Sequence, residues 1–229
     1  MEHRIIDQQL DLLRDKILLL GGATEAALQR AMRSLTERDS DLARRVLEED
    51  ETIDLMELEI DRLSIDIIGS QQPAAHDLRF VISVAKITPI LERIADHASN
   101  IAEAALILNN EPVVSNYIDM SMMAEIAADM LRTALDAFTT EDAKVSRQVI
   151  KRDKEIDRSY NRVFGELIQG MIGNPSSVTA AAQLLFVAKH LERIGDYVKD
   201  ICELTVYLRE AAFIKHSQSI HFSEQPSVN

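Results

Sequence analysis

Two rows of acidic side chains are the residues of this 229-residue chain best suited to hold a ligand. The first row consists of Glu92, Asp96, Asn100 and Glu103. Their spacing of four, four and three residues puts them within an arc of roughly 80° on one face of a helix. The second row has the same spacing and consists of Glu192, Asp196, Asp200 and Glu203.

These residue types suggest a cation site. Carboxylate and amide oxygens are the ligands that hard divalent or trivalent cations prefer. Acidic side chains four residues apart on a helix repel one another, and an ordinary solvated face would intersperse Lys or Arg. The rows therefore predict either a metal site or a solvated acidic face, and their spacing alone leaves both interpretations open.

Shorter acidic rows precede the long ones. Asp50, Asp54 and Glu57 form one of them, and Asp153 and Asp157 form its counterpart. If each short row lies on a helix that packs antiparallel to the following one, it could face the long row there. Asp50, Asp54, Asp153 and Asp157 are therefore possible further ligands.

The acidic rows belong to an internal repeat. The segment Leu91-Glu92-Arg93-Ile94-Ala95-Asp96 matches residues 191–196 at an offset of 100. Upstream, residues 50–54 match residues 153–157 at an offset of 103. The difference of three residues fits a shorter turn between helices in the second half, where length changes are tolerated. The chain is therefore predicted to contain a duplicated unit.

The elements that must position these residues are helices. Apolar residues recur at steps of three and four along nearly the whole chain, which predicts helices over about 10–35, 41–69, 74–110, 115–138, 141–172 and 176–215. Asp39, Ser40 and Asp41 can cap the second helix. Gly21 and Gly22 fit a close contact between helices, and Pro89 is expected to kink the third helix.

The predicted fold is therefore all-α, with two tandem, pseudo-symmetric antiparallel three-helix bundles. Residues 1–110 form the first bundle, residues 111–215 the second, and residues 216–229 a polar, flexible tail.

Composition excludes several classes of protein. The 38 acidic residues exceed the 25 basic ones and give a net charge of −13, which argues against nucleic-acid binding. Few Gly, Pro and aromatic residues argue against an all-β fold. The single Cys202 cannot form an internal disulfide, and the chain has no apolar stretch typical of a signal peptide or a transmembrane segment. We therefore expect a soluble cytoplasmic protein.

Motifs for catalysis are missing. No His follows a Glu by three residues, as in ferritin-like di-iron enzymes, and neither a glycine-rich phosphate loop nor a nucleophile elbow occurs. We expect no enzymatic activity. A carboxylate-bound iron protein, either for metal storage or as a metal-dependent enzyme, is the alternative.

The repeated motif resembles the PhoU family of phosphate-uptake regulators. The resemblance rests on the doubled Leu-Glu-Arg-Ile-Ala/Gly-Asp segment, on Asp77-Leu78-Arg79 after Pro73, and on the two Asp-x-x-Ile-Asp segments. It extends over essentially residues 1–215. It implies two tandem three-helix bundles, a homodimer and no established catalysis.

The resemblance also implies a function. It suggests a regulator that restrains high-affinity phosphate uptake by contacting the phosphate ABC transporter ATPase and the phosphate-sensing histidine kinase. An accessory protein of a low-affinity phosphate transporter is a further alternative.

The resemblance finally implies bound metal, iron or zinc, at the two acidic rows. The second row departs from the family pattern, because Tyr197, Lys199 and Asp200 replace the His97, Ser99 and Asn100 of the first. The two rows are therefore not expected to be equivalent as metal sites.

Overall fold

The computed structural model describes residues 5–112 and 117–214, which form six long α-helices, one 3₁₀ turn and no strand. The helices are α1 (Ile5–Thr36), α2 (Ser40–Gln71), α3 (Ala75–Leu108), α4 (Tyr117–Thr139), α5 (Ala143–Gly173) and α6 (Val178–Glu210). The all-α prediction is confirmed. The predicted tail and the start predicted for the fourth helix lie outside the described residues.

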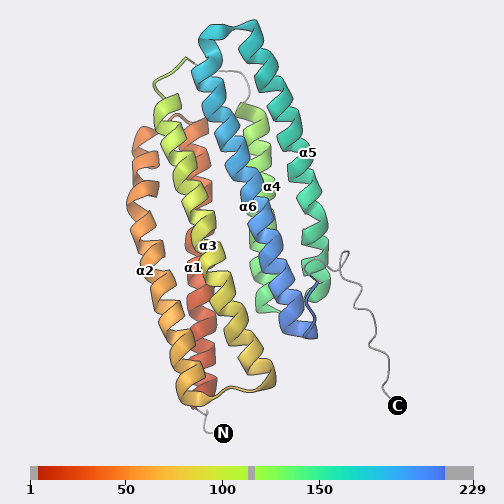
Figure 1. Cartoon of the computed structure of the whole chain (residues 1–229). Coiled ribbons are helices and arrows are strands. Elements are labelled where there is room, and N and C mark those ends of the chain that lie inside the picture. The colour runs from red at the N-terminus through yellow and green to blue at the C-terminus, as the bar shows by residue number, and fades with distance from the viewer. Residues whose placement is uncertain (1–4, 113–116, 215–229) are drawn as a thin grey trace, which may run out of the picture.

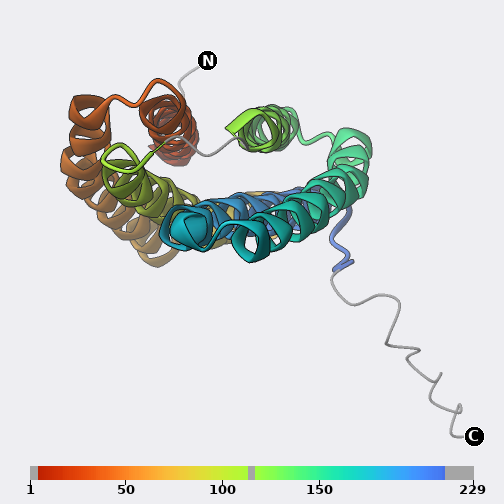
Figure 2. The same ribbon diagram turned by 90° about the horizontal axis from the view of Figure 1, so that it is seen from above.

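Each half of the chain forms an antiparallel three-helix bundle. In the first half α1, α2 and α3 contact one another, and in the second half α4, α5 and α6 do. Figures 1 and 2 show α3 and α6 side by side in the middle, with α1 and α2 on one side and α4 and α5 on the other. This arrangement agrees with the predicted pair of tandem bundles.

The two bundles meet through equivalent helices that run in opposite directions. His97 of α3 contacts His190 of α6. Closer to the start of α3 and to the end of α6, Lys86 and Leu204 line the same small cavity. On α1 and α4, the Arg132 Nε atom lies 3.2 Å from Glu25 Oε1. The halves are thus related by an approximate two-fold rotation, and an internal duplication is expected to produce such symmetry.

One hydrophobic core continues through both bundles. Fully buried residues include Leu20 of α1, Leu91 of α3 and Leu191 of α6. Gly21 lies where α1 meets α4, and a Cβ atom built there would lie 2.7 Å from Leu135 Cδ1. The expected close helix contact therefore exists at Gly21. Gly22 has no heavy atom within 4 Å of such a Cβ atom.

The helix boundaries follow local signals. Asp39 caps α2 by accepting hydrogen bonds from the backbone N–H groups of Asp41 and Leu42. Asp142, at the offset of 103 residues, caps α5 in the same way.

The predicted end of the sixth helix at Lys215 is wrong, because α6 ends at Glu210. Ala211 has a left-handed backbone with φ 56°, which stops the helix. Phe213 then stacks on Tyr207, with the ring centroids 4.2 Å apart. The apolar residues beyond Glu210 therefore continue the periodic pattern without continuing the helix.

Pro89 lies inside α3, which remains helical from Ala75 to Leu108. The Thr88 hydroxyl donates a hydrogen bond of 2.9 Å to the carbonyl of Val84, and the Thr24 hydroxyl of α1 reaches the carbonyl of Leu91 at 3.4 Å. The α3 helix continues through Pro89 without a break. The bend expected at Pro89 remains a prediction. None of the described helices is long and apolar enough to cross a membrane.

Candidate functional site

Acidic residues of α2 and α3 form what we call the first cluster. Its members are Asp50, Asp54 and Glu57 of α2 and Glu92 and Asp96 of α3. They come together because α2 and α3 pack side by side, and of the first long row only Glu92 and Asp96 lie beside the short row of α2.

The carboxylates of the first cluster repel one another. Burial, together with the charges of Asp96 and Glu57, raises the pKa of Glu92 to about 7. Burial and the charges of Asp50 and Asp54 raise the pKa of Asp96 as well. Arg93 opposes both shifts but is outweighed. The first cluster therefore favours proton uptake, and a cation would be attracted to it for the same reason.

Two polar residues of α3 border the first cluster. The buried Ser99 donates a hydrogen bond of 3.0 Å from its Oγ atom to Asp50 Oδ1. The Asn100 side-chain amide donates a hydrogen bond of 2.7 Å to the backbone carbonyl of Asp96. The amide nitrogen of the predicted ligand Asn100 is thus engaged with its own helix.

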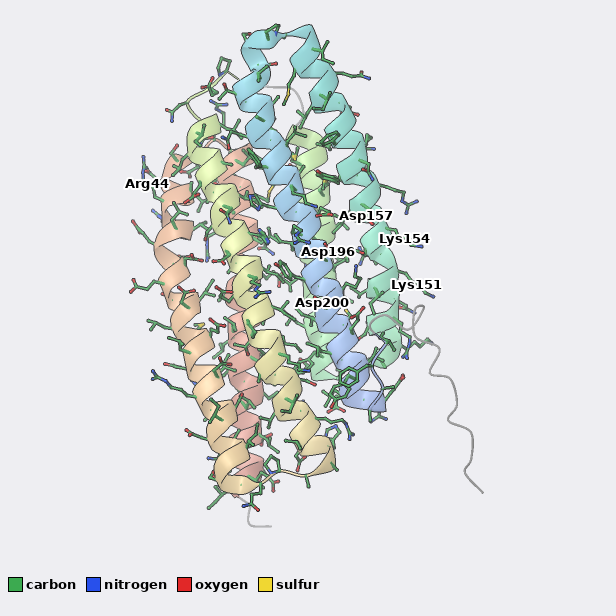
Figure 3. All side chains as sticks on the ribbon, viewed as in Figure 1. Arg44, Lys151, Lys154, Asp157, Asp196 and Asp200 are labelled. Carbon is green, nitrogen blue, oxygen red and sulfur yellow. The ribbon has the colours of Figure 1, made fainter. Side chains whose placement is uncertain are left out.

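The second cluster occupies the equivalent place in the other half. It consists of Asp153 and Asp157 of α5 and Glu192 and Asp196 of α6. Figure 3 shows Asp157 and Asp196 where α5 and α6 run side by side, whereas Lys151 and Lys154 of α5 extend away from α6. Burial and the neighbouring charges, above all Asp153, raise the pKa of Asp157.

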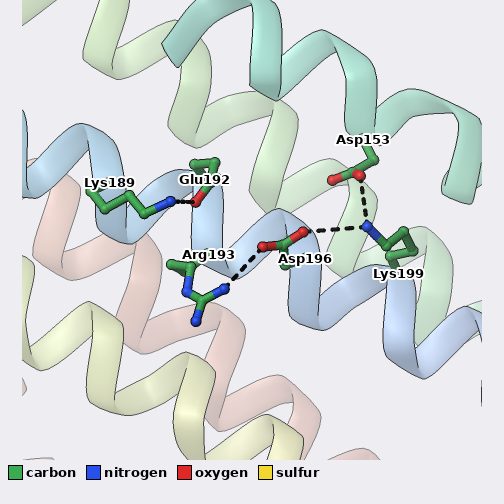
Figure 4. Close-up of polar contacts among 6 residues, drawn as sticks. All are labelled: Asp153, Lys189, Glu192, Arg193, Asp196 and Lys199. Carbon is green, nitrogen blue, oxygen red and sulfur yellow. Dashed lines mark hydrogen bonds and ion pairs between the residues drawn. The ribbon is translucent and has the colours of Figure 1, made fainter. Parts of the chain in front are cut away.

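A lysine lies within the second cluster (Figure 4). The Lys199 Nζ atom lies 3.0 Å from Asp153 Oδ2 on α5 and 3.3 Å from Asp196 Oδ1 on α6. Burial lowers the pKa of Lys199, but its hydrogen bonds and ion pairs with Asp153 and Asp196 outweigh that effect, so the net shift is upward. Lys199 is therefore held in its charged form.

Two more cations border the second cluster. Lys189 Nζ lies 2.6 Å from Glu192 Oε2, and Arg193 Nη1 lies 3.3 Å from Asp196 Oδ2 (Figure 4). The clusters thus share a position in the fold but differ in charge balance.

The remaining predicted ligands face elsewhere. Glu103 is exposed, and its charge opposes the lowering of the His190 pKa by burial across the α3–α6 junction. Asp200 and Glu203 line a cavity of about 210 Å³ that Lys86 and Phe213 also line. Neither long row thus faces a single neighbouring helix. In the part of the chain that the structure describes, no three His, Cys, Asp or Glu side chains come together as they would around a bound metal ion.

A histidine pair at the junction was not predicted. His97 Nδ1 and His190 Nδ1 lie 2.9 Å apart, and the ring of Tyr197 lies beside His97 with the ring centroids 5.5 Å apart. His97 directly follows Asp96 of the first row in the sequence. His190 could not be recognised as its partner because the repeat has Ile90 at the corresponding position. The contacts of Ser99 with Asp50 and of Lys199 with Asp153 were also not predicted. The repeat nevertheless aligns Ser99 with Lys199 and Asp50 with Asp153.

Comparison with known proteins agrees with the duplicated architecture. The family model of the PhoU domain matches this chain in two segments, residues 17–105 and 120–205. This chain belongs to the PhoU family. Each matched segment contains one copy of the repeated motif and one long acidic row, so the PhoU domain occurs twice.

Relatives of this PhoU-family chain match it over most of its length. A Zymomonas mobilis protein named phosphate-specific transport system accessory protein PhoU homolog is 37% identical over 204 residues, or 89% of this chain and 86% of the relative. A Pseudomonas aeruginosa protein of the same name is 34% identical over 233 residues, or 100% of this chain and 96% of the relative.

Solved PhoU structures share the fold. The crystal structure of PhoU from Pseudomonas aeruginosa matches with a TM-score of 0.87 and 35% identity, covering 90% of this chain and 99% of that one. The regulatory protein PhoU of the Streptococcus pneumoniae phosphate transport system matches with a TM-score of 0.85 and 29% identity, covering 91% and 99%.

Proposed function

We propose that this chain is a non-enzymatic, cytoplasmic regulator of phosphate transport. It restrains high-affinity phosphate uptake and keeps the phosphate-starvation response repressed when phosphate is plentiful. In this proposal it acts as a homodimer that contacts the phosphate ABC transporter ATPase and the phosphate-sensing histidine kinase. The observation that carries the proposal is that the PhoU domain model matches residues 17–105 and 120–205. Relatives that match most of this chain are named as accessory proteins of phosphate transport.

Removing the gene tests the regulatory role. Deletion should leave phosphate-starvation genes expressed in phosphate-rich medium, because the repressing contact with the sensor kinase is lost. A transcriptional reporter of those genes measures the effect, and a plasmid copy should restore repression. Repression that persists after deletion, in a strain with no second copy of the protein, would contradict the proposal.

The partners are tested separately. Tagged protein from phosphate-replete cells should co-purify with the transporter ATPase and the kinase, and size-exclusion chromatography with light scattering should give twice the mass of the chain. Recovery of a low-affinity phosphate transporter in place of both partners would favour the alternative function stated above.

A second proposal concerns metal at the first cluster. Its five carboxylates come from two helices, and their mutual repulsion would be relieved by a divalent or trivalent cation such as zinc or iron. Carboxylate oxygens are the donors that a hard cation prefers, and binding one would require these side chains to move closer together than they lie in the described structure. Glu92 and Asp96 would hold the ion from α3, with Asp50, Asp54 and Glu57 contributing from α2. The bound charge would hold the two helices together.

Elemental analysis tests the metal proposal. Asp96→Asn keeps the size of the side chain and removes its charge, so the protein purified after zinc loading should lose most of its zinc. Asp66→Asn makes the same change at an exposed position of α2 and should leave the zinc content unaltered. Equal zinc in both variants would place the ion elsewhere. Catalytic turnover with loaded iron would favour the enzyme alternative.

A further inference from the structure

Asp200 in place of Asn100 adds a carboxylate to the second long row, but at three other positions that the repeat sets in correspondence the second cluster is less negative than the first. The pairs are Glu57 and Tyr160, Pro89 and Lys189, and Ser99 and Lys199. The first replacement removes a carboxylate, and the other two add an ammonium group. The two halves therefore share a backbone arrangement but not an electrostatic environment.

Ser99 and Lys199 make the same contact with different chemistry. Ser99 Oγ donates to Asp50 Oδ1 at 3.0 Å, and Lys199 Nζ donates to Asp153 Oδ2 at 3.0 Å. Asp50 and Asp153 themselves correspond at the offset of 103 residues. The serine hydroxyl leaves the charge of Asp50 in place, whereas the lysine ammonium neutralises that of Asp153.

The position of Lys199 is the one that a metal ion shared by α5 and α6 would need. Its Nζ atom lies between Asp153 of α5 and Asp196 of α6, within 3.3 Å of an oxygen of each (Figure 4). Asp153 is 9% exposed, so its charge is shielded from water and depends on this partner. A metal ion could bind both carboxylates only by displacing the ammonium group and overcoming its repulsion.

Two further cations contact the second cluster, of which Lys189 corresponds to Pro89 of the first half and Arg193 corresponds to Arg93. Lys189 pairs with Glu192 and lies over the ring of Tyr160, with 5.4 Å between its Nζ atom and the ring centroid. Arg193 pairs with Asp196. Among the described residues, three cations thus contact the carboxylates of the second cluster. The donor set of this cluster, occupied by its own cations, therefore does not fit a metal ion.

We propose that Lys199 takes the place of a metal ion in the second cluster, so that this chain has one metal-responsive half and one half that is neutralised by its own side chain. The proposal rests on the proposed metal binding at the first cluster only for the zinc that the unmodified chain itself should bind. The exclusion of metal by Lys199 is tested independently.

Reciprocal substitutions at the matched positions provide the test. Lys199→Ser gives the second cluster the residue of the first, and Ser99→Lys does the reverse. Lys154→Ser is the matched control, because it removes the same charge from the exposed outer side of α5. The full-length protein is stripped of metal, incubated with Zn²⁺ and desalted, and its zinc content per chain and thermal midpoint are measured.

We expect Lys199→Ser to bind about one more zinc ion per chain than the control and to lose that ion when Asp153→Asn is added. Without zinc its thermal midpoint should fall below that of the control, and zinc should restore it. Ser99→Lys should bind less zinc than the unmodified chain. Zinc in Lys199→Ser no higher than in Lys154→Ser would overturn the proposal.

The two proposals fail in different ways. If the unmodified chain binds no zinc but Lys199→Ser does, metal binding at the first cluster is wrong and the role of Lys199 is supported. If Lys199→Ser does not fold, Lys199→Gln, which removes the charge and keeps more of the side chain, takes its place. Zinc in Lys199→Gln no higher than in Lys154→Ser would overturn the role assigned to Lys199.

Discussion

The environment of Glu92 lowers the stability of the metal-free protein at neutral pH. The pKa of Glu92 is raised to about 7 by burial and by the nearby Asp96 and Glu57, so the folded state binds a proton that the unfolded state releases near pH 4.5. The folded protein therefore loses stability as the pH rises from about 4.5 to 7. The full cost is present above that range and absent below it.

Replacing Glu92 by Gln removes this cost. The metal-free variant should be more stable than the unmodified protein by about 1 kcal/mol at pH 8, a value reduced for partial solvent screening. The advantage should vanish as the pH falls below about 4.5. Urea unfolding across this pH range measures it, and Glu51→Gln, at an exposed position of α2, is the control. An equal gain at every pH would mean that charge is not the cause.

At the scale of the elements, two adjacent glycines of α1 have different roles. Gly22 is exposed, so Ala there should stabilise α1 by about 0.5–1 kcal/mol through helix propensity. Gly21 contacts α4, and an added methyl group must displace Leu135. Gly21→Ala should therefore be at least about 1 kcal/mol less stable than Gly22→Ala in urea unfolding. Equal stability of the two variants would mean that α1 and α4 do not pack closely in solution.

At the scale of the whole molecule, the histidine pair links the two bundles. Burial, then the charge of His190, lowers the pKa of His97 to about 4, and burial also lowers that of His190. Arg193 adds to the shift at His97, whereas Glu103 opposes the shift at His190. The unfolded chain binds protons near pH 6.5 and the folded chain resists them, so stability falls as the pH drops from about 6.5 to 4.

Removing one histidine should weaken this acid sensitivity. In metal-free protein, His190→Gln should reduce the stability lost between pH 6.5 and 4 by about 1 kcal/mol, allowing for partial exposure. Thermal unfolding over this pH range measures the loss. His76→Gln is the control, because His76 is exposed and pairs with Glu141 at 2.8 Å away from the junction. The same acid dependence in both variants would rule out the pair as its source.

Much of the fold followed from the sequence because helix formation leaves local signals. The helices were predicted from the period of the apolar residues and from caps such as Asp39. Their duplication was predicted from the segments that repeat at offsets of 100 and 103 residues. The sixth helix was the exception, because nothing local distinguishes Ala211 from the helical residues before it.

The sequence by itself determined which residues are equivalent in the two halves, and the tertiary structure decided what each of them touches. The contacts of Ser99 with Asp50, Lys199 with Asp153 and His97 with His190 join residues 46 to 93 positions apart. Such contacts depend on how far each helix is rotated and shifted along its neighbour. Rotation and shift are set by the packing of the whole core, which no single stretch of sequence encodes.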